Sequence, residues 1–220
     1  MTDKLIDKPV PGVKTDARPH PAGKEGAMLS LQEVADRGWK ARMSPRLRAW
    51  VTQQLDKCGV SRGTRVQKMR CAVDAFRKKV AYINDPLMGE FMATPDQILC
   101  LDEDGICILG FDCDEATITV IAMALCIGIP AMVIGCSFRP PLDTPTHVFG
   151  AFQDESGDWV KVDATTQHPV GSVPPHAREF WFEPGKQSKE SGRGDFVGMS
   201  AEVGVSGAPI AIDWMFPGLR

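Results

Sequence analysis

The sequence lacks several features that would place it in a large class of proteins. Its 220 residues contain no run of about 18 apolar residues, and the first 30 residues are polar and proline-rich, without the apolar core of a signal peptide. We therefore expect a protein that is made in the cytoplasm and does not span a membrane. No glycine-rich phosphate loop connects a strand to a helix, so nothing indicates a nucleotide cofactor.

Short paired ligand spacings are also missing. A zinc site made from Cys100, Cys107, His168 and His176 would lack the close ligand pairs typical of zinc proteins, so we expect no metal and no other cofactor. The seven cysteines are odd in number and irregularly spaced, which argues against a disulfide framework. Apart from Cys113, discussed below, we expect them to be small buried hydrophobic residues.

Composition predicts one domain with extensions, because 43% hydrophobic residues suffice for a single core. Proline and glycine in 1–28 predict an extended arm. The core domain then covers 29–184, helical over 29–83 and mixed over 84–184. Residues 185–220 form a glycine- and serine-rich linker followed by an apolar tail.

Charge divides the chain unevenly. Residues 1–80 carry 18 Lys and Arg against 8 Asp and Glu, and residues 81–220 carry 7 against 20. The basic half either contacts phosphate or an acidic partner, or consists of solvated helix faces docked on the acidic half. A nucleic-acid-binding function has no further support, since aromatic residues are not interleaved with the basic ones.

Capping signals predict four helices before residue 100. The first has a capping box at Ser30 and ends at Gly38, and the third exposes its basic side chains. The expected helices run from Ser30 to Gly38, from Ser44-Pro45 to Gly59, from Thr64 to the break at Asn84-Asp85-Pro86, and from Thr94 to Leu99; the exposed basic residues are Arg65, Lys68, Arg77 and Lys78.

The stretch from Cys113 to Ile127 predicts a buried helix, because it is apolar on nearly every side after an acidic first turn. Asp112 is the expected N-cap and Gly128 the expected stop. Cys113 is then the first helical residue, with a free backbone N–H and a sulfur beside the positive end of the helix dipole. Both features favour a thiolate nucleophile with an adjacent oxyanion site.

Three strands should follow, at 131–138, 147–153 and 159–164, with a turn over 154–158. Helices followed by antiparallel strands define an α+β fold. We expect His147 and Asp163 to pair directly across the second hairpin, with the turn centred on Glu155 and Ala151 opposite Trp159.

With the chain order Cys113, His147, Asp163, the sequence resembles the transglutaminase-like branch of the papain-like cysteine enzymes. Within that branch it most resembles the prokaryotic and phage-encoded members. The resemblance covers roughly residues 44–170. The similar blocks are Tyr82–Pro86, Thr94–Leu99, Asp112–Asp114, Gly128–Ala131, His147-Val148 and Trp159–Thr165. Phe111 stands where that family usually has glycine, and Glu115 where it often has a second aspartate.

This resemblance implies a catalytic triad without a cofactor. Cys113 would attack, His147 would move the proton, and Asp163 would orient the imidazole. His147 should then dominate the pKa of the Cys113 thiol, provided that the neighbouring carboxylates of Asp112, Asp114 and Glu115 point to solvent. The remaining assignments are the Cys113 amide and Gln97 as oxyanion donors, Trp159 as a lid, core or binding residue, and His168 as the rival base.

The predicted function is cysteine-dependent acyl transfer, with hydrolysis of a peptide or amide bond through a thioester on Cys113. A transglutaminase that passes the acyl group to an amine is an alternative. A structural virion or tail component of a phage-type particle is another, with protein partners held by the arms at 1–28 and 185–220. The enzymatic and the structural functions are compatible if the enzyme is built into such a particle.

Overall fold

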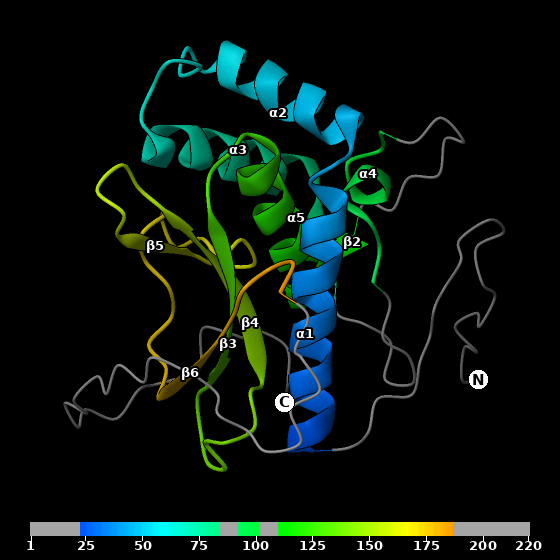
Figure 1. The fold of residues 1–220 in the computed structure, drawn as a ribbon, viewed down its shortest axis with the longest axis vertical. Coiled ribbons are helices and arrows are strands. Elements are labelled where there is room, and N and C mark those ends of the chain that lie inside the picture. Colours follow the sequence, from blue (N-terminus) through cyan, green and yellow to red (C-terminus); the bar gives the residue numbers. More distant parts are fainter. Residues whose placement is uncertain (1–22, 84–91, 102–109, 187–220) are drawn as a thin grey trace, which may run out of the picture.

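A computed structural model describes residues 23–83, 92–101 and 110–186 of the chain. The described elements are helices α1 (Lys24–Ala41), α2 (Pro45–Lys57), α3 (Arg65–Lys79), α4 (Pro95–Ile98) and α5 (Cys113–Cys126), and strands β1 (Ala81–Tyr82), β2 (Gly110–Phe111), β3 (Ala131–Ser137), β4 (His147–Gln153), β5 (Trp159–Val162) and β6 (Arg178–Phe182). Figure 1 shows α2 and α3 gathered at one end of the molecule, while α1 runs along its length. The α+β class is confirmed.

Helix α5 forms the centre of the core and bears out the predicted buried helix. Asp112 is its N-cap, and Gly128 follows it with φ 78, the left-handed conformation that ends a helix without a Cβ penalty. One face of the sheet packs on α5, and α1 packs on another side of the same helix. No helix of the described chain is long and apolar enough to cross a membrane.

Helix α1 corrects two predictions. It begins at Lys24, so residues 24–28 belong to a helix and not to the extended arm, and it continues through Gly38 to Ala41. Neither Ser30 nor Gly38 bounds it, because Leu31, Val34 and Gly38 lie on one buried stripe. Gly38 packs so closely on α5 that an added Cβ would lie 3.0 Å from Ile121. Tertiary packing therefore overrides the local stop signal.

Helices α2 and α3 confirm their predicted starts. Ser44 and Thr64 cap them through their side chains, and Gly59 ends α2 with φ 69. Helix α3 ends at Lys79, before the predicted break, and its chain continues into β1. Helix α4 also confirms its prediction, with Thr94 as its cap.

The cysteine prediction is wrong in part. Cys58 and Cys71 form a disulfide between α2 and α3, and Cys100 is also disulfide-bonded. Sequence spacing could not reveal the first bond, because it is the antiparallel packing of the two helices that brings the sulfur atoms together. Cys126 and Cys136 are buried free thiols, as predicted.

The main sheet has the order β5-β4-β3-β6 with antiparallel neighbours. All three predicted strands are present, and β6 is a fourth that the sequence did not predict. In the β4–β5 hairpin Ala151 pairs with Lys161 and Gln153 with Trp159, so the predicted register is wrong by two residues. A slip of two keeps every side chain on its face, so His147 and Asp163 still share one face of the hairpin.

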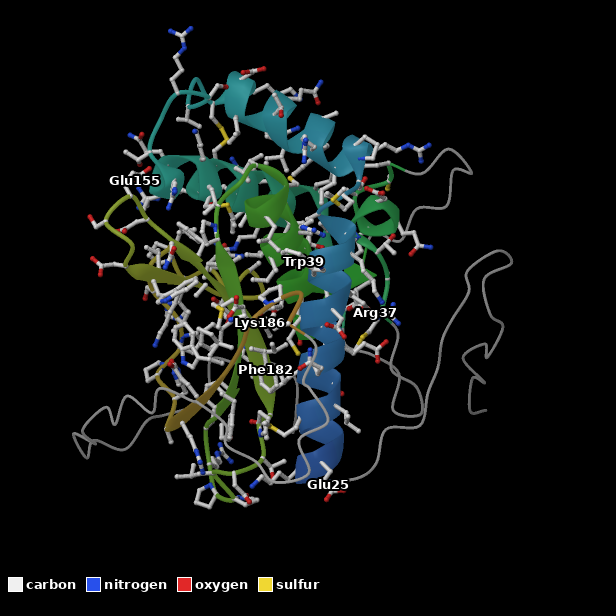
Figure 2. All side chains as sticks on the ribbon, in the orientation of Figure 1. Glu25, Arg37, Trp39, Glu155, Phe182 and Lys186 are labelled. Atoms are coloured by element: carbon white, nitrogen blue, oxygen red, sulfur yellow. A yellow bond between two sulfur atoms is a disulfide. The ribbon has the colours of Figure 1, made fainter. Side chains whose placement is uncertain are left out.

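Arg65 and Arg77 of α3 form hydrogen bonds at the two ends of β5. The prediction that these two side chains point outward is therefore wrong. At the turn end, the Arg65 guanidinium donates to the Asp154 carbonyl at 2.9 Å, and its backbone N–H donates to the Glu155 carboxylate. Figure 2 shows Glu155 at the tip of this hairpin, beside α3. At the other end, Arg77 binds the loop that contains Asp163.

The segment after β6 returns to α1. Gly185 packs on the Trp39 ring, where an added Cβ would lie 2.4 Å from Cε2. Residues 185 and 186 are therefore docked on the domain and do not start the predicted linker there. Most of the predicted arms, at 1–22 and 187–220, lies outside the described residues.

The Cys58–Cys71 bond should stabilise the domain measurably, because it closes a loop with a sequence separation of 13. A cross-link over such a loop contributes about 3 kcal/mol. We expect Cys58→Ser/Cys71→Ser to lose about this much free energy of unfolding, measured by urea denaturation without reductant. Adding reductant should destabilise wild type more than the double variant, which lacks the Cys58–Cys71 bond and keeps the disulfide of Cys100. Equal midpoints for wild type and double variant would contradict the assignment.

Candidate active site

The candidate nucleophile lies at the first residue of α5. The capping box that starts the helix is reciprocal, because Asp112 accepts from the Asp114 N–H at 2.8 Å and Glu115 accepts from the Asp112 N–H at 3.0 Å. Cys113 is therefore held at a fixed helix start with its side chain half-buried. It is the most accessible of the three free thiols in the described part of the chain.

Glu115 is a buried carboxyl, 3% exposed, that also joins α5 to the segment before α4. Its second oxygen accepts from the Ala93 N–H at 3.2 Å. Burial, and then the hydrogen bond with Asp112, raise the pKa of Glu115 to about 9, so it holds a proton at neutral pH. Glu115 thus fixes the geometry without adding a negative charge beside Cys113.

The electrostatics at Cys113 differ from the sequence-based expectation. Burial raises the pKa of the Cys113 thiol, and the carboxylates of Asp114 and Asp112 raise it further. The Sγ atom lies 3.6 Å from Asp114 Oδ1. Neither aspartate is fully exposed, so the condition for a dominant His147 is not met. With its pKa raised in this way, Cys113 is a protonated thiol at neutral pH when no substrate is bound.

Strand β4 supplies the opposing influence. The Val148 backbone N–H hydrogen-bonds to the Cys113 sulfur and lowers the pKa of the thiol. This contact places Cys113 against the start of β4, beside His147. It also provides a donor that is strengthened when the sulfur becomes negative, because hydrogen bonds to ionised acceptors are the stronger ones.

His147 and Asp163 form the candidate base and its orienting group. His147 Nε2 lies 2.9 Å from Asp163 Oδ2, and Asp163 is 1% exposed. Burial alone would raise the pKa of Asp163, but the hydrogen bond and charge of His147 and two hydrogen bonds from Thr165 hold it below its usual value. An ionised carboxylate at Nε2 leaves Nδ1 as the imidazole nitrogen for proton exchange.

Two aromatic rings pack beside the imidazole. The Phe138 ring centroid lies 5.9 Å from that of His147, and the Phe149 centroid 6.3 Å away. Phe149 in turn packs on His176, which pairs with Glu179. The ring of His147 is therefore oriented by packing as well as by Asp163.

Arg77 is a site residue that the sequence did not reveal. Its guanidinium donates to the carbonyls of Asp163 at 2.6 Å and His168 at 2.9 Å, and it pairs with Asp74 at 3.8 Å. These bonds fix the backbone that carries the Asp163 carboxylate. No sequence signal indicated this, because Arg77 lies among the other basic residues at the end of α3.

Gln97 and Trp159 do not join this group. The Gln97 side-chain oxygen accepts from the Thr94 N–H at 3.0 Å, so it completes the capping box of α4. Trp159 pairs with Gln153 at the turn end of the hairpin, four residues from Asp163, and packs edge-on against Trp181 at 6.0 Å. Gln97 is thus engaged in capping α4, and Trp159 lies at the far end of the hairpin from Asp163. The Cys113 amide as an oxyanion donor stays a prediction.

One side-chain group in the described residues has the composition of a cation site. The ligand atoms of Asp112, Cys113 and Asp114 all lie within 4.8 Å of one another. Asp112 is already engaged in capping α5. We therefore attribute the closeness of these three side chains to the geometry of the helix start and not to a metal site.

Comparisons with known proteins give only distant similarities. Neither a protein-family model nor a curated protein matches the chain. Among solved structures, a candidate cysteine protease from Cytophaga hutchinsonii is 18% identical over 54% of this chain and 36% of its own, with a TM-score of 0.37. A candidate protease from Parabacteroides distasonis is 13% identical, covering 70% and 32% of the two chains, with a TM-score of 0.45.

A structure named as a TGase is 12% identical, covering 68% of this chain and 35% of its own, with a TM-score of 0.34. This chain thus spans about a third of the length of each of the three proteins. At these scores the similarities do not define a family for the chain.

The carboxylate of Asp114 should control the reactivity of Cys113. Because its charge raises the pKa of the thiol, we expect Asp114→Asn to move the pH profile of iodoacetamide alkylation at Cys113 to lower pH. Mass spectrometry of the labelled peptide gives the rate at each pH. Asp158→Asn, in the exposed hairpin turn, is the control and should leave the profile in place. A profile unchanged in Asp114→Asn would contradict this account.

Arg77 should be needed for both stability and orientation. Arg77→Met leaves two loop carbonyls without their charged donor, and we expect a loss of about 1–3 kcal/mol in the free energy of unfolding. At a temperature where Arg77→Met is folded, we also expect His147→Ala to change the rate of Cys113 alkylation less in the Arg77→Met background than in wild type. Lys78→Met, an exposed neighbour on α3, should change neither quantity.

Proposed function

We propose that the chain is a cysteine-dependent acyl-transfer enzyme, in which Cys113 is the nucleophile, His147 the base and Asp163 the residue that orients it. The observation that carries this proposal is the His147–Asp163 hydrogen bond of 2.9 Å at the start of β4, where the next backbone N–H reaches the Cys113 sulfur. A nucleophile, a base and a group that orients the base are the three parts such catalysis requires.

The reaction begins when His147 takes the proton of the Cys113 thiol. The sulfur then bonds to the carbonyl carbon of the acyl donor, and the resulting oxyanion is stabilised by the Cys113 N–H at the helix start. The tetrahedral intermediate collapses to a thioester, while the leaving amine receives the proton from His147. Water or a second amine then releases the acyl group.

The raised pKa of the thiol defines a resting state for this enzyme. Burial, and then the charges of Asp114 and Asp112, favour the protonated sulfur, so the thiol and not the thiolate is the resting form of Cys113. The Val148 N–H acts in the opposite direction, because it hydrogen-bonds to the sulfur and lowers the pKa of the thiol. We infer that the thiolate forms only as His147 takes the proton.

Peptide or amide hydrolysis is the outcome we favour, and transfer to an amine is the alternative. The triad is the same for both, so the outcome depends on which nucleophile reaches the thioester. The proposed role in a phage-type particle depends on the arms, which lie almost wholly outside the described residues, and it stays a prediction. The disulfide points to use of the protein outside a reducing compartment.

The proposal is tested by trapping the acyl-enzyme. We expect 4-nitrophenyl acetate to acylate Cys113, detected by intact mass and peptide mapping, and His147→Ala to slow this acylation about 100-fold at pH 7. His168→Ala tests the rival base and should have no such effect. Loss of acylation in His168→Ala with a normal rate in His147→Ala would reverse the assignment. If 4-nitrophenyl acetate labels Cys113 no faster in the folded protein than in the unfolded protein, the proposed enzymatic function is refuted.

Decay of the trapped acyl group then distinguishes the two outcomes. Release of free acetate in buffer alone indicates a hydrolase. An acyl-enzyme that persists in buffer and is discharged by an added primary amine, with formation of the amide, indicates a transferase.

A further inference from the structure

Tyr82, the single tyrosine of the chain, lies beside the polypeptide that leads into Cys113. Strand β1 pairs in parallel with β2, so that Tyr82 is opposite Phe111, and the Ile83 N–H donates to the Phe111 carbonyl at 2.9 Å. The residues after Phe111 are Asp112 and Cys113. Main-chain hydrogen bonds therefore fix the position of Tyr82 relative to the start of α5.

Packing restricts the tyrosine ring as well. It meets the Phe111 ring edge-on, with 5.9 Å between centroids, and Phe111 is itself 4% exposed and packed on Phe76 at 4.9 Å. Gly110 leaves room for Ile83, since an added Cβ would lie 2.6 Å from its Cδ1. Tyr82 is nevertheless 44% exposed, so a bound substrate can reach it.

The electrostatic surroundings of the hydroxyl agree with this placement. Burial raises the pKa of Tyr82, and the charges of the ionised Cys113, Asp112, Asp163 and Asp114 raise it further. Among these charges, Cys113 contributes most once its thiol is ionised. A phenol in this environment keeps its proton and acts as a hydrogen-bond donor to a negative charge formed at the sulfur or on the oxygen of a carbonyl carbon that the sulfur has attacked.

We propose that Tyr82 is a catalytic residue whose hydroxyl donates a hydrogen bond to the oxyanion formed when Cys113 attacks an acyl donor. The inference rests on the proposed function. As the carbon–sulfur bond forms, the carbonyl π electrons move to oxygen, and the Tyr82 O–H and the Cys113 N–H donate to that oxygen. Tyr82 keeps its proton throughout, and the electrons return when the leaving group departs.

This assignment fills the position left by Gln97. One backbone N–H at a helix start is a single donor, whereas oxyanion sites combine two or more. Gln97 is engaged in capping α4, and Tyr82 approaches Cys113 from the strand beside it.

Two reactions of the same thiol test the proposal, because only one of them forms an oxyanion. Acylation by 4-nitrophenyl acetate passes through a tetrahedral oxyanion, and alkylation by iodoacetamide is a direct displacement. In Tyr82→Phe, which keeps the ring packing, we expect acylation of Cys113 to slow about 100-fold while alkylation stays within about twofold of wild type. Ile83→Val should change neither rate.

The possible results separate the two proposals. Unchanged acylation in Tyr82→Phe would overturn the role of Tyr82 and leave the triad in place. Equal slowing of both reactions would also overturn it, because the hydroxyl would then act on the thiolate and not on the oxyanion. If wild-type Cys113 is not acylated at all, the proposed function fails, and the assignment of Tyr82 fails with it.

A spectroscopic measurement tests the proximity independently of activity. Since the chain has one tyrosine, the absorbance of its phenolate at alkaline pH reports Tyr82 alone. Cys113→Ala removes the largest charge that raises the pKa of Tyr82, so we expect the titration midpoint to move to lower pH. An unchanged midpoint in folded protein would contradict the proximity of Tyr82 and Cys113.

Discussion

The site depends on the reciprocal capping at the start of α5. Asp112 and Glu115 satisfy backbone donors that the helix leaves unpaired, and Glu115 also binds the Ala93 N–H. A single buried carboxyl thus connects α5, the end of β2 and the segment that leads into α4. If this connection were lost, the position of Cys113 relative to β4 would no longer be defined, even with the apolar core intact.

Helix α3 plays the corresponding role on the other side of the site. It holds the β4–β5 hairpin through Arg65 at the turn and Arg77 at the Asp163 loop. The hairpin carries His147 on one strand and Asp163 just beyond the other. The proposed nucleophile and the proposed base therefore belong to two separately supported units, which meet where the Val148 N–H contacts the Cys113 sulfur.

Sequence reasoning succeeded where local signals and tertiary packing agree. The caps at Ser44, Thr64, Thr94 and Asp112 predicted four helix starts correctly, and apolar runs bounded by turn residues predicted three strands. It failed where packing decides. Gly38 reads as a helix stop and serves as a contact point on Ile121, and the basic residues of α3 look solvent-exposed although Arg77 binds buried carbonyls.

For the site, the sequence predicted which face of the β4–β5 hairpin carries His147 and Asp163, but not the register of the two strands. Parity placed His147 and Asp163 on the same side of the hairpin, which the structure confirms, but the register was wrong by two residues because the turn centre cannot be read from composition. The sequence did not indicate that Tyr82 lies near Cys113, because this placement arises from a parallel pairing between two-residue strands. Pairings this short leave almost no periodic signal.

The two aspartates beside Cys113 have a consequence for the lifetime of the protein. Oxidants attack the thiolate and not the thiol, and the first product, a sulfenic acid, leads on to irreversible forms. A thiol held where disulfides persist is exposed to such oxidants. Burial and the charges of Asp114 and Asp112 hold the sulfur in its protonated form, so the residues that oppose formation of the reactive anion also slow oxidation of Cys113.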